Sequence, residues 1–295
     1  MHTRPLARTG LTAFALTAAL AVPGLAQSPA VTNTPAAVAV DATAVPAGPV
    51  AYIWRGHETE IEAFLRTAPV VRWKDIPVGI TKPRRGYFEP GGPATSFAWK
   101  PLPTQVMHGK MESYKSEIAA YLLSRHLGMD VVPPVVERQI GASKGAAVYW
   151  IENVRPWNPA TPPKGPGARW SRQTSRMQMF DQLIANIDRN QGNLLHDDAG
   201  HVYLIDHSRA FGTNPTLGTV KPPSQFDRAL WLRMAALTKT DLETALKPWL
   251  TSTQIDALLS RRNEMRRHID RLVGERGDEI TFLPADPEAV AVSAR

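Results

Sequence analysis

Three oxygen-bearing side chains stand at defined intervals in an otherwise apolar stretch between residues 180 and 211. Asp188 and Asn193 bracket the segment DRNQGN, and Asp206 follows the run VYLI. Carboxylate and amide oxygens suit Mg²⁺, which commonly binds one or two carboxylates together with the phosphates of a substrate. An acid beside such a site can also accept a proton from a reacting hydroxyl. These residue types and spacings indicate metal-assisted chemistry on a phosphate compound.

Local sequence patterns predict how the three side chains converge. Apolar residues from Met177 to Ile187 recur at helical spacing, and the Gly and Asn residues of DRNQGN end that helix in a tight loop. The runs LLH and HVYLID flank the turn DDAG and predict a hairpin. Asn193 would enter its first strand and Asp206 would leave its second. Asp188, in the preceding loop, would then lie at the same edge of a small sheet.

A lysine and a glutamate upstream are expected to form a pair. Lys100 ends the strand-like run FAWK, and Glu117 lies in the helical run YKSEIAAYLLSRHLG, with Ser113 as its N-cap and Gly128 as its stop. Glu117 borders the apolar face of that helix. A carboxylate that is desolvated without a partner costs several kcal/mol, so we expect Lys100 to pair with Glu117.

The D-x-x-x-x-N spacing of Asp188 and Asn193, with Asp206 after a hairpin, resembles the catalytic core of protein kinases. No H-R-D triplet precedes Asp188, and D-F-G is replaced by Asp206-His207-Ser208. NIDRNQGNLL and LIDHSRAF are more similar to the atypical kinases of the phosphoinositide 3/4-kinase-like group, with secretory-pathway kinases and bacterial toxin kinases as relatives. The resemblance covers roughly residues 76–275 and suggests a bacterial member of this group, for which the N-terminus predicts export.

The resemblance implies a phosphotransferase that uses ATP with Mg²⁺, or Mn²⁺, and it implies a role for each residue. Lys100 would hold the nucleotide phosphates, and Glu117 would orient Lys100. Asn193 and Asp206 would bind the metal, while Asp188 would be the catalytic residue that aligns and deprotonates the acceptor hydroxyl. The acceptor is left open between a protein, a lipid head group and a small molecule.

Further contacts with the nucleotide are implied by the same resemblance. Arg189 would contact phosphate or the carboxylates of the metal site. The segment VYWIENV, with Glu152 and Asn153, would form the hinge that holds adenine. GITKPRRGYF lacks the G-x-G-x-x-G pattern of a glycine loop, and its basic residues are weaker candidates for phosphate contacts: Lys82, Arg84 and Arg85.

The implied fold is α+β and two-lobed, like a protein kinase: a small mixed β lobe with one main helix, then an α-rich lobe that carries the catalytic hairpin. We place the nucleotide-binding N-lobe at 51–154 and the α-rich C-lobe at 174–283. Residues 155–173 between them hold five prolines and two glycines, which predicts a linker or loop. Residues 284–295 are expected to be a tail.

The N-terminus predicts export. Residues 1–26 combine Arg4 and Arg8 with an apolar stretch of about a dozen residues, shorter than the roughly 20 that span a bilayer, so a cleavable signal peptide is favoured over a stable transmembrane anchor. Residues 27–50 would be a flexible leader. The 295-residue chain has no cysteine, which excludes disulfides and thiolate metal sites. Export predicts a periplasmic or secreted protein, a location where ATP is scarce.

Three other interpretations compete with a phosphotransferase. A degenerate kinase used as a scaffold would keep the fold without the activity. A metal-dependent hydrolase could use His196 and His207 with the neighbouring acids, although no H-E-x-x-H pair is present. The basic run RRNEMRRHIDRLVGER could suggest nucleic acid, but its apolar stripe and interspersed acids are typical of a solvated helix, so no nucleic-acid partner is expected.

Overall fold

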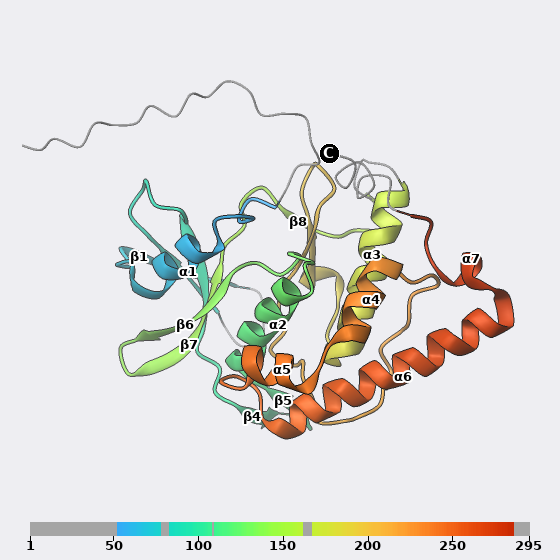
Figure 1. The fold of residues 1–295 in the computed structure, drawn as a ribbon. Coiled ribbons are helices and arrows are strands. Elements are labelled where there is room, and N and C mark those ends of the chain that lie inside the picture. Colours follow the sequence, from blue (N-terminus) through green and yellow to red (C-terminus); the bar gives the residue numbers. More distant parts are fainter. Residues whose placement is uncertain (1–51, 78–82, 108, 162–166, 286–295) are drawn as a thin grey trace, which may run out of the picture. The chain divides into compact units, whose positions relative to one another are not determined.

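The computed structural model describes residues 52–77, 83–107, 109–161 and 167–285. The predicted signal peptide, the predicted leader, Lys82 and most of the predicted tail lie outside these residues. Within them, the order of a β-rich part with one main helix, followed by an α-rich part with a hairpin, is as predicted (Figure 1). No helix in the described ranges is both long enough and apolar enough to cross a membrane.

The N-terminal part is built on a five-stranded sheet in which every pair of neighbouring strands is antiparallel. Helix α1 (Glu58–Thr67) packs against it. In spatial order the strands are β1 (Arg72–Asp75), β2 (Arg84–Tyr87), β3 (Ser96–Lys100), β7 (Ser143–Tyr149) and β6 (Val135–Ile140).

Side-chain alternation along β3 decides where Lys100 points. Phe97 and Trp99 face the apolar cluster beneath α1, whereas Ala98 packs against the larger cluster that includes α2 (Tyr114–His126). Because successive side chains of a strand point to opposite faces, Lys100 leaves the sheet on the same side as Ala98. The sheet therefore directs this lysine towards α2.

Helix α2 begins and ends where the sequence predicted. The Ser113 hydroxyl accepts a hydrogen bond from the backbone N–H of Lys115, which makes Ser113 its N-cap. Gly128 follows the helix with φ +60°, a left-handed conformation that glycine adopts at little cost. A short hairpin that the sequence did not reveal, β4 (Gln105–Met107) and β5 (Lys110–Glu112), leads directly into this cap.

The C-terminal part contains the predicted hairpin, with β9 (Leu194–His196) and β10 (Val202–Leu204) antiparallel, and a third strand, β8 (Arg155–Pro156), that was not predicted. A 3-10 turn, η1 (Gln191–Asn193), precedes β9. The helices of this part are α3 (Gly167–Ile184), α4 (Arg228–Ala236), α5 (Lys239–Leu246), α6 (Ser252–Arg276) and α7 (Asp278–Thr281).

Helix α3 begins at Gly167, inside the range 155–173 that was predicted to be a linker or loop, and β8 also lies in that range. The prolines of the range end at residue 166, so from Gly167 onwards no proline opposes a helix. Trp170 stacks on Trp157 with ring centroids 6.3 Å apart and packs against the main core. This contact gives the first turns of α3 an apolar anchor.

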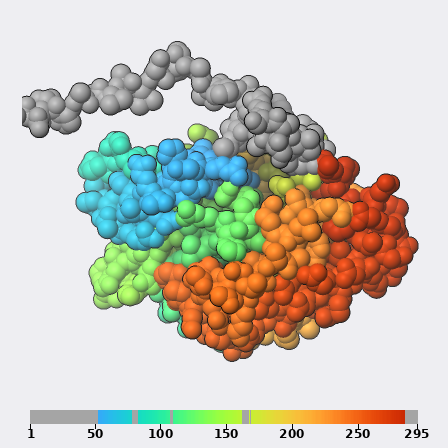
Figure 2. Space-filling view, viewed as in Figure 1, coloured from blue at the N-terminus to red at the C-terminus, as the bar shows by residue number. Residues whose placement is uncertain are grey.

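Two apolar clusters hold the described residues together. The smaller lies between α1 and the five-stranded sheet, and the larger joins α2 to the helices and hairpin of the C-terminal part. Figure 2 shows α2 in green between the blue N-terminal elements and the orange helices. Since α2 contributes to the larger cluster and also packs against β6 and β7, it links the sheet to the C-terminal part.

Candidate active site

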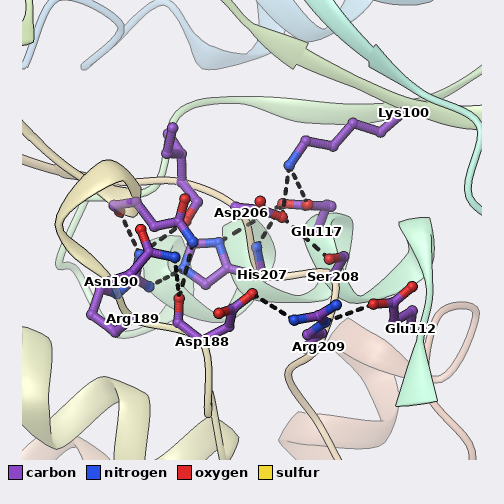
Figure 3. Close-up of polar contacts among 12 residues, drawn as sticks. Lys100, Glu112, Glu117, Asp188, Arg189, Asn190, Asp206, His207, Ser208 and Arg209 are labelled. Atoms are coloured by element: carbon purple, nitrogen blue, oxygen red, sulfur yellow. Dashed lines mark hydrogen bonds and ion pairs between the residues drawn. The ribbon is translucent and has the colours of Figure 1, made fainter. Parts of the chain in front are cut away.

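Lys100 lies between two carboxylates that come from different parts of the chain (Figure 3). Its Nζ is 2.6 Å from Oε1 of Glu117 and 3.1 Å from Oδ1 of Asp206. The side chains of Lys100 and Glu117 are 12% and 2% exposed. The predicted Lys100–Glu117 pair is thus confirmed, and the structure adds Asp206 to it.

The charges of this group determine its protonation. The nearby Lys100 ammonium lowers the pKa of the Asp206 carboxyl to about 2, against the opposing effect of burial. Burial by itself would lower the pKa of Lys100, but the carboxylates of Asp206 and Glu117 outweigh it and raise that pKa. Burial raises the pKa of Glu117, an effect that the Lys100 ammonium opposes. At neutral pH, Lys100 is therefore an ammonium and Asp206 a carboxylate.

The backbone around Lys100 and Asp206 is tightly constrained. A Cβ on Gly145 of β7 would lie 2.6 Å from the carbonyl oxygen of Lys100, so only glycine lets the strands approach here. Asp206 has φ +60°, a conformation that is costly for a residue with a side chain. The backbone N–H of His207 donates to Oε2 of Glu117 at 3.0 Å, which ties the segment after Asp206 to α2.

The loop that carries Asp188 and Asn193 is fixed through its backbone. The Asn193 Nδ2 donates to the carbonyl oxygen of Asp188 at 2.9 Å, and the Asn186 side chain accepts from the N–H of Asp188 at 3.2 Å. The N–H of Ile205 donates to the carbonyl oxygen of Asn193 at 3.2 Å. As predicted, Asn193 and Asp206 are thus brought to neighbouring strand ends, with Asp188 beside them.

The oxygen atoms available in this group suit a divalent cation. With Nδ2 of Asn193 engaged by Asp188, its Oδ1 is the amide atom left to accept or coordinate. Oδ1 of Asp206 accepts from Lys100 and Ser208, while Oδ2 has no hydrogen bond among the described residues. One carboxylate and one amide oxygen match the small number of protein ligands that Mg²⁺ or Mn²⁺ takes beside phosphates.

Arg189 does not point into this group, which corrects the prediction that it contacts the nucleotide or the metal-site carboxylates. Its Nε and Nη2 donate to both carboxylate oxygens of Asp181 in α3, at 2.9 and 3.0 Å. Its Nη1 donates to the carbonyl oxygens of Asn193 and Ile205, and Nη2 lies 2.9 Å from Nε2 of His207. These contacts tie the loop to α3 and to the segment after β10, so Arg189 supports the loop.

The predicted hinge and loop residues are engaged with one another. Glu152 forms an ion pair with Arg85 and accepts from the Thr95 hydroxyl at 3.2 Å. Arg85 also lies over the Trp150 ring, 4.1 Å from its centroid, and Arg84 pairs with Asp75. Both arginines thus have partners on or beside the sheet, and a phosphate contact from either stays a prediction.

Asn153, the other predicted hinge residue, is exposed and has φ +57°. The segment Trp150–Val154 follows β7 directly, and the N–H of Trp150 donates to the carbonyl oxygen of Ser96 at 3.2 Å. The structure thus places these residues after β7, while a contact with adenine stays a prediction.

The two histidines of the hydrolase alternative are buried and engaged. His207 has Arg189 against Nε2, and burial, together with the Arg189 and Lys100 charges, holds its pKa well below the usual value. His196 packs edge-on against Trp170, and its Nδ1 lies 3.1 Å from the carbonyl oxygen of Asp197. Among the described residues, no group of three His, Asp or Glu side chains is arranged to hold a metal. The geometry disfavours a histidine-ligated metal centre.

One residue that the sequence did not identify belongs to this site. Arg209, three positions after Asp206, lies between Asp188 and Glu112 at the end of β5 (Figure 3). The partners of Arg209 are far from it in the sequence, so no local pattern indicated these contacts.

The fold is that of known secretory-pathway kinases. No protein-family model matches the sequence, and no curated protein gives a significant sequence match. The chain aligns with the Golgi casein kinase with Mn and ADP bound at a TM-score of 0.61 and 14% identity, over 79% of this chain and 80% of that one. It aligns with hydra Fam20 with sugar at a TM-score of 0.61 and 17% identity, over 77% of this chain and 92% of that one.

A second structure of the Golgi casein kinase aligns at a TM-score of 0.60, over 77% of this chain and 78% of that one. At these identities the likeness concerns the fold alone. It confirms the predicted α+β, kinase-like fold and its similarity to secretory-pathway kinases.

Proposed function

We propose that this kinase-like chain is a phosphotransferase that takes ATP with Mg²⁺ or Mn²⁺ and phosphorylates a hydroxyl group of a protein, lipid or small molecule. The observation that carries the proposal is the position of Lys100 between Glu117 and Asp206, beside the loop of Asp188 and Asn193. A lysine with two carboxylates in a partly buried group has the charges that triphosphate and a divalent cation require.

Each side chain has a task in this proposal. Lys100, oriented by Glu117, would hold a phosphate oxygen, and Asp206 with Oδ1 of Asn193 would hold the cation. Asp188 would align the acceptor hydroxyl and accept its proton. ATP and its metal would supply the transferable phosphoryl group and the charge that neutralises it. The Golgi casein kinase that shares the fold was solved with Mn and ADP, which supports a nucleotide and a divalent metal here.

The proposal also includes export to the periplasm or the outside of the cell, on the strength of residues 1–26. Mass spectrometry of the exported protein is expected to find Gln27 as its first residue. An exported protein that still carries residues 1–26 would contradict the signal peptide. Because ATP is scarce outside the cytoplasm, transfer from another nucleotide and nucleotidyl transfer belong in the assays.

Nucleotide binding will raise the unfolding temperature of the purified protein. A ligand at 100 times its Kd stabilises the native state by about 2.7 kcal/mol, which for a domain of this size is about 5 to 11 °C. Lys100→Met removes the phosphate-binding cation and is expected to abolish this shift. The matched control is Lys144→Met, because Lys144 lies on the same sheet, is exposed and pairs with Glu137.

Lys100→Met also leaves Glu117 buried without its partner, which destabilises a protein by about 3 to 5 kcal/mol. The double variant Lys100→Met/Glu117→Gln removes that charge as well and keeps the test valid if the single variant unfolds. Absence of any shift in the unsubstituted protein, across nucleotides and divalent metals, would favour the scaffold alternative. A shift that survives in the double variant would contradict the role of Lys100.

A further inference from the structure

We infer that Arg209 is a positioning residue: held by the buried Glu112, it orients the carboxylate of Asp188 so that Oδ1 is left for the acceptor hydroxyl. The inference rests on the proposed function and names a part of the site that the resemblance does not supply. It is based on the two contacts that link Arg209 to Glu112 and to Asp188 (Figure 3).

Glu112 is buried and anchors Arg209. Its side chain is 1% exposed, and Oε1 accepts from Nε of Arg209 at 2.6 Å. Its Oε2 is buried and has no hydrogen-bond partner among the described residues. A buried carboxylate is costly unless a cation compensates it, so the Glu112 site is stable only with Arg209 in this position. Glu112 therefore determines where the guanidinium lies.

The backbone around both residues is held on each side. Ser113, which follows Glu112, donates from its N–H to the carbonyl oxygen of Ser208 at 2.9 Å. The Ser116 hydroxyl donates to the carbonyl oxygen of Ala210 at 3.2 Å. Ser208 and Ala210, the two neighbours of Arg209, are thus hydrogen-bonded to the N-cap and the first turn of α2. The backbone is therefore fixed on both sides of Arg209 and next to Glu112.

The free end of the guanidinium reaches Asp188. Nη1 of Arg209 lies 3.2 Å from Oδ2 of Asp188, whose side chain is 34% exposed while that of Arg209 is 14% exposed. Asn193 and Asn186 fix the backbone of Asp188, and Arg209 is the partner of its carboxylate among the described residues. With Oδ2 occupied, Oδ1 is the oxygen that can accept the proton of a hydroxyl.

Orientation matters for a general base because it acts only within hydrogen-bond reach of the proton that it removes. A partly exposed aspartate without a partner samples several rotamers, and a planar guanidinium with fixed donors restricts it to fewer of them. Arg209 is not free to act as a separate anion-binding residue, because Glu112 and Asp188 already compensate its charge. Its effect on transfer must therefore pass through Asp188.

The experiment is a double-mutant cycle on the rate at which the purified protein converts ATP to ADP in the presence of Mn²⁺ or Mg²⁺, with water as the acceptor. The variants are Arg209→Gln, Asp188→Asn and the two combined, and Arg271→Gln is the matched control. Arg271 is an exposed arginine that pairs with Glu275 on α6, outside the site. The KM for ATP and the unfolding temperature are measured for each protein.

We expect Arg209→Gln to lower kcat about 10- to 100-fold with the KM for ATP unchanged, because the base loses its alignment while the proposed nucleotide-binding groups stay in place. In the Asp188→Asn background the same change is expected to have no further effect, since residues that act as a unit are not additive. Glu112→Gln, which keeps the shape but loses the charge, is expected to give a smaller loss of kcat of the same kind.

Two results would overturn the inference while leaving the proposed function in place. One is multiplicative losses in the double variant, which would mean that Arg209 acts independently of Asp188. The other is an unchanged kcat in Arg209→Gln, or a change confined to the KM for ATP. No ADP formation by the unsubstituted protein would overturn both the proposed function and the inference. A lower unfolding temperature with unchanged kcat would assign Arg209 a purely structural role.

Discussion

Replacing Asp188 with asparagine is expected to lower the rate of phosphoryl transfer by about 10² to 10⁴, the usual contribution of a general base. Asparagine keeps the size and shape of the side chain and can still accept from Arg209, but it cannot take a proton. Nucleotide affinity is expected to stay unchanged, because Lys100, Asn193 and Asp206 remain in place. Turnover assays and binding titrations on the same preparation separate the two effects.

Asp198→Asn is the control for this prediction. Asp198 is an exposed acid in the turn of the same hairpin and pairs with Arg155. Both variants are expected to unfold at nearly the temperature of the unsubstituted protein, because neither carboxylate lies in the core. Loss of nucleotide binding in Asp188→Asn would show that Asp188 holds the nucleotide or its metal, and the assigned role would be wrong.

Replacing Asp206 with alanine is expected to abolish the metal-dependent part of nucleotide binding. Asp206 is the charged ligand of the proposed cation site, and the remaining ligand, Asn193, carries no charge. The Lys100 ammonium keeps the pKa of Asp206 at about 2, so protonation does not remove this ligand at pH 5 to 8. The measurement is a calorimetric titration with ATP in the presence and absence of Mg²⁺ or Mn²⁺.

Asp198→Ala serves as the matched control in that titration. Lys100 keeps Glu117 as its partner when Asp206 is lost, so the buried charges remain compensated and the variant is expected to fold. Metal-free ATP is expected to bind the variant as it binds the unsubstituted protein. An equal gain in affinity from the metal in both proteins would place the cation elsewhere.

Much of the arrangement around the site was predictable because local signals agreed with one another. Ser113 as an N-cap, Gly128 as a stop and the helical spacing between them located α2. The turn DDAG between two apolar runs located the hairpin, and with it the relation of Asn193 to Asp206. The Lys100–Glu117 pair followed from the kinase-like pattern together with the cost of burying a carboxylate without a partner.

The elements that were missed have weak local signals. Strands β1, β4, β5 and β8 are two to four residues long, too short for an alternating pattern to stand out. The start of α3 at Gly167 was hidden by the prolines just before it, although the tryptophan packing of Trp157 and Trp170 stabilises that first turn. Strand β8 pairs with β9, which lies far along the chain, so no local pattern could indicate it.

The orientation of arginine side chains was the hardest feature to predict. Arg189 stands beside Asp188 in the sequence, yet its partners are Asp181 in α3 and backbone carbonyls beneath the loop. Arg209 is bound by Glu112 from a hairpin almost a hundred residues away. A long, flexible arginine side chain points to where carboxylate and carbonyl oxygens are available to accept its hydrogen bonds. Those oxygens come together only when the chain is folded.

The most direct test of the central claim is to identify the products that the purified protein forms from ATP with Mn²⁺ or Mg²⁺, by phosphorus NMR and mass spectrometry. The account predicts ADP, with the γ-phosphoryl group on an acceptor hydroxyl or released by water, and ADP formation that is about 10² to 10⁴ times slower in Asp188→Asn. Formation of AMP or pyrophosphate with the nucleotide left on the acceptor would instead show nucleotidyl transfer. Either that result or intact ATP after prolonged incubation would contradict the proposed phosphotransferase.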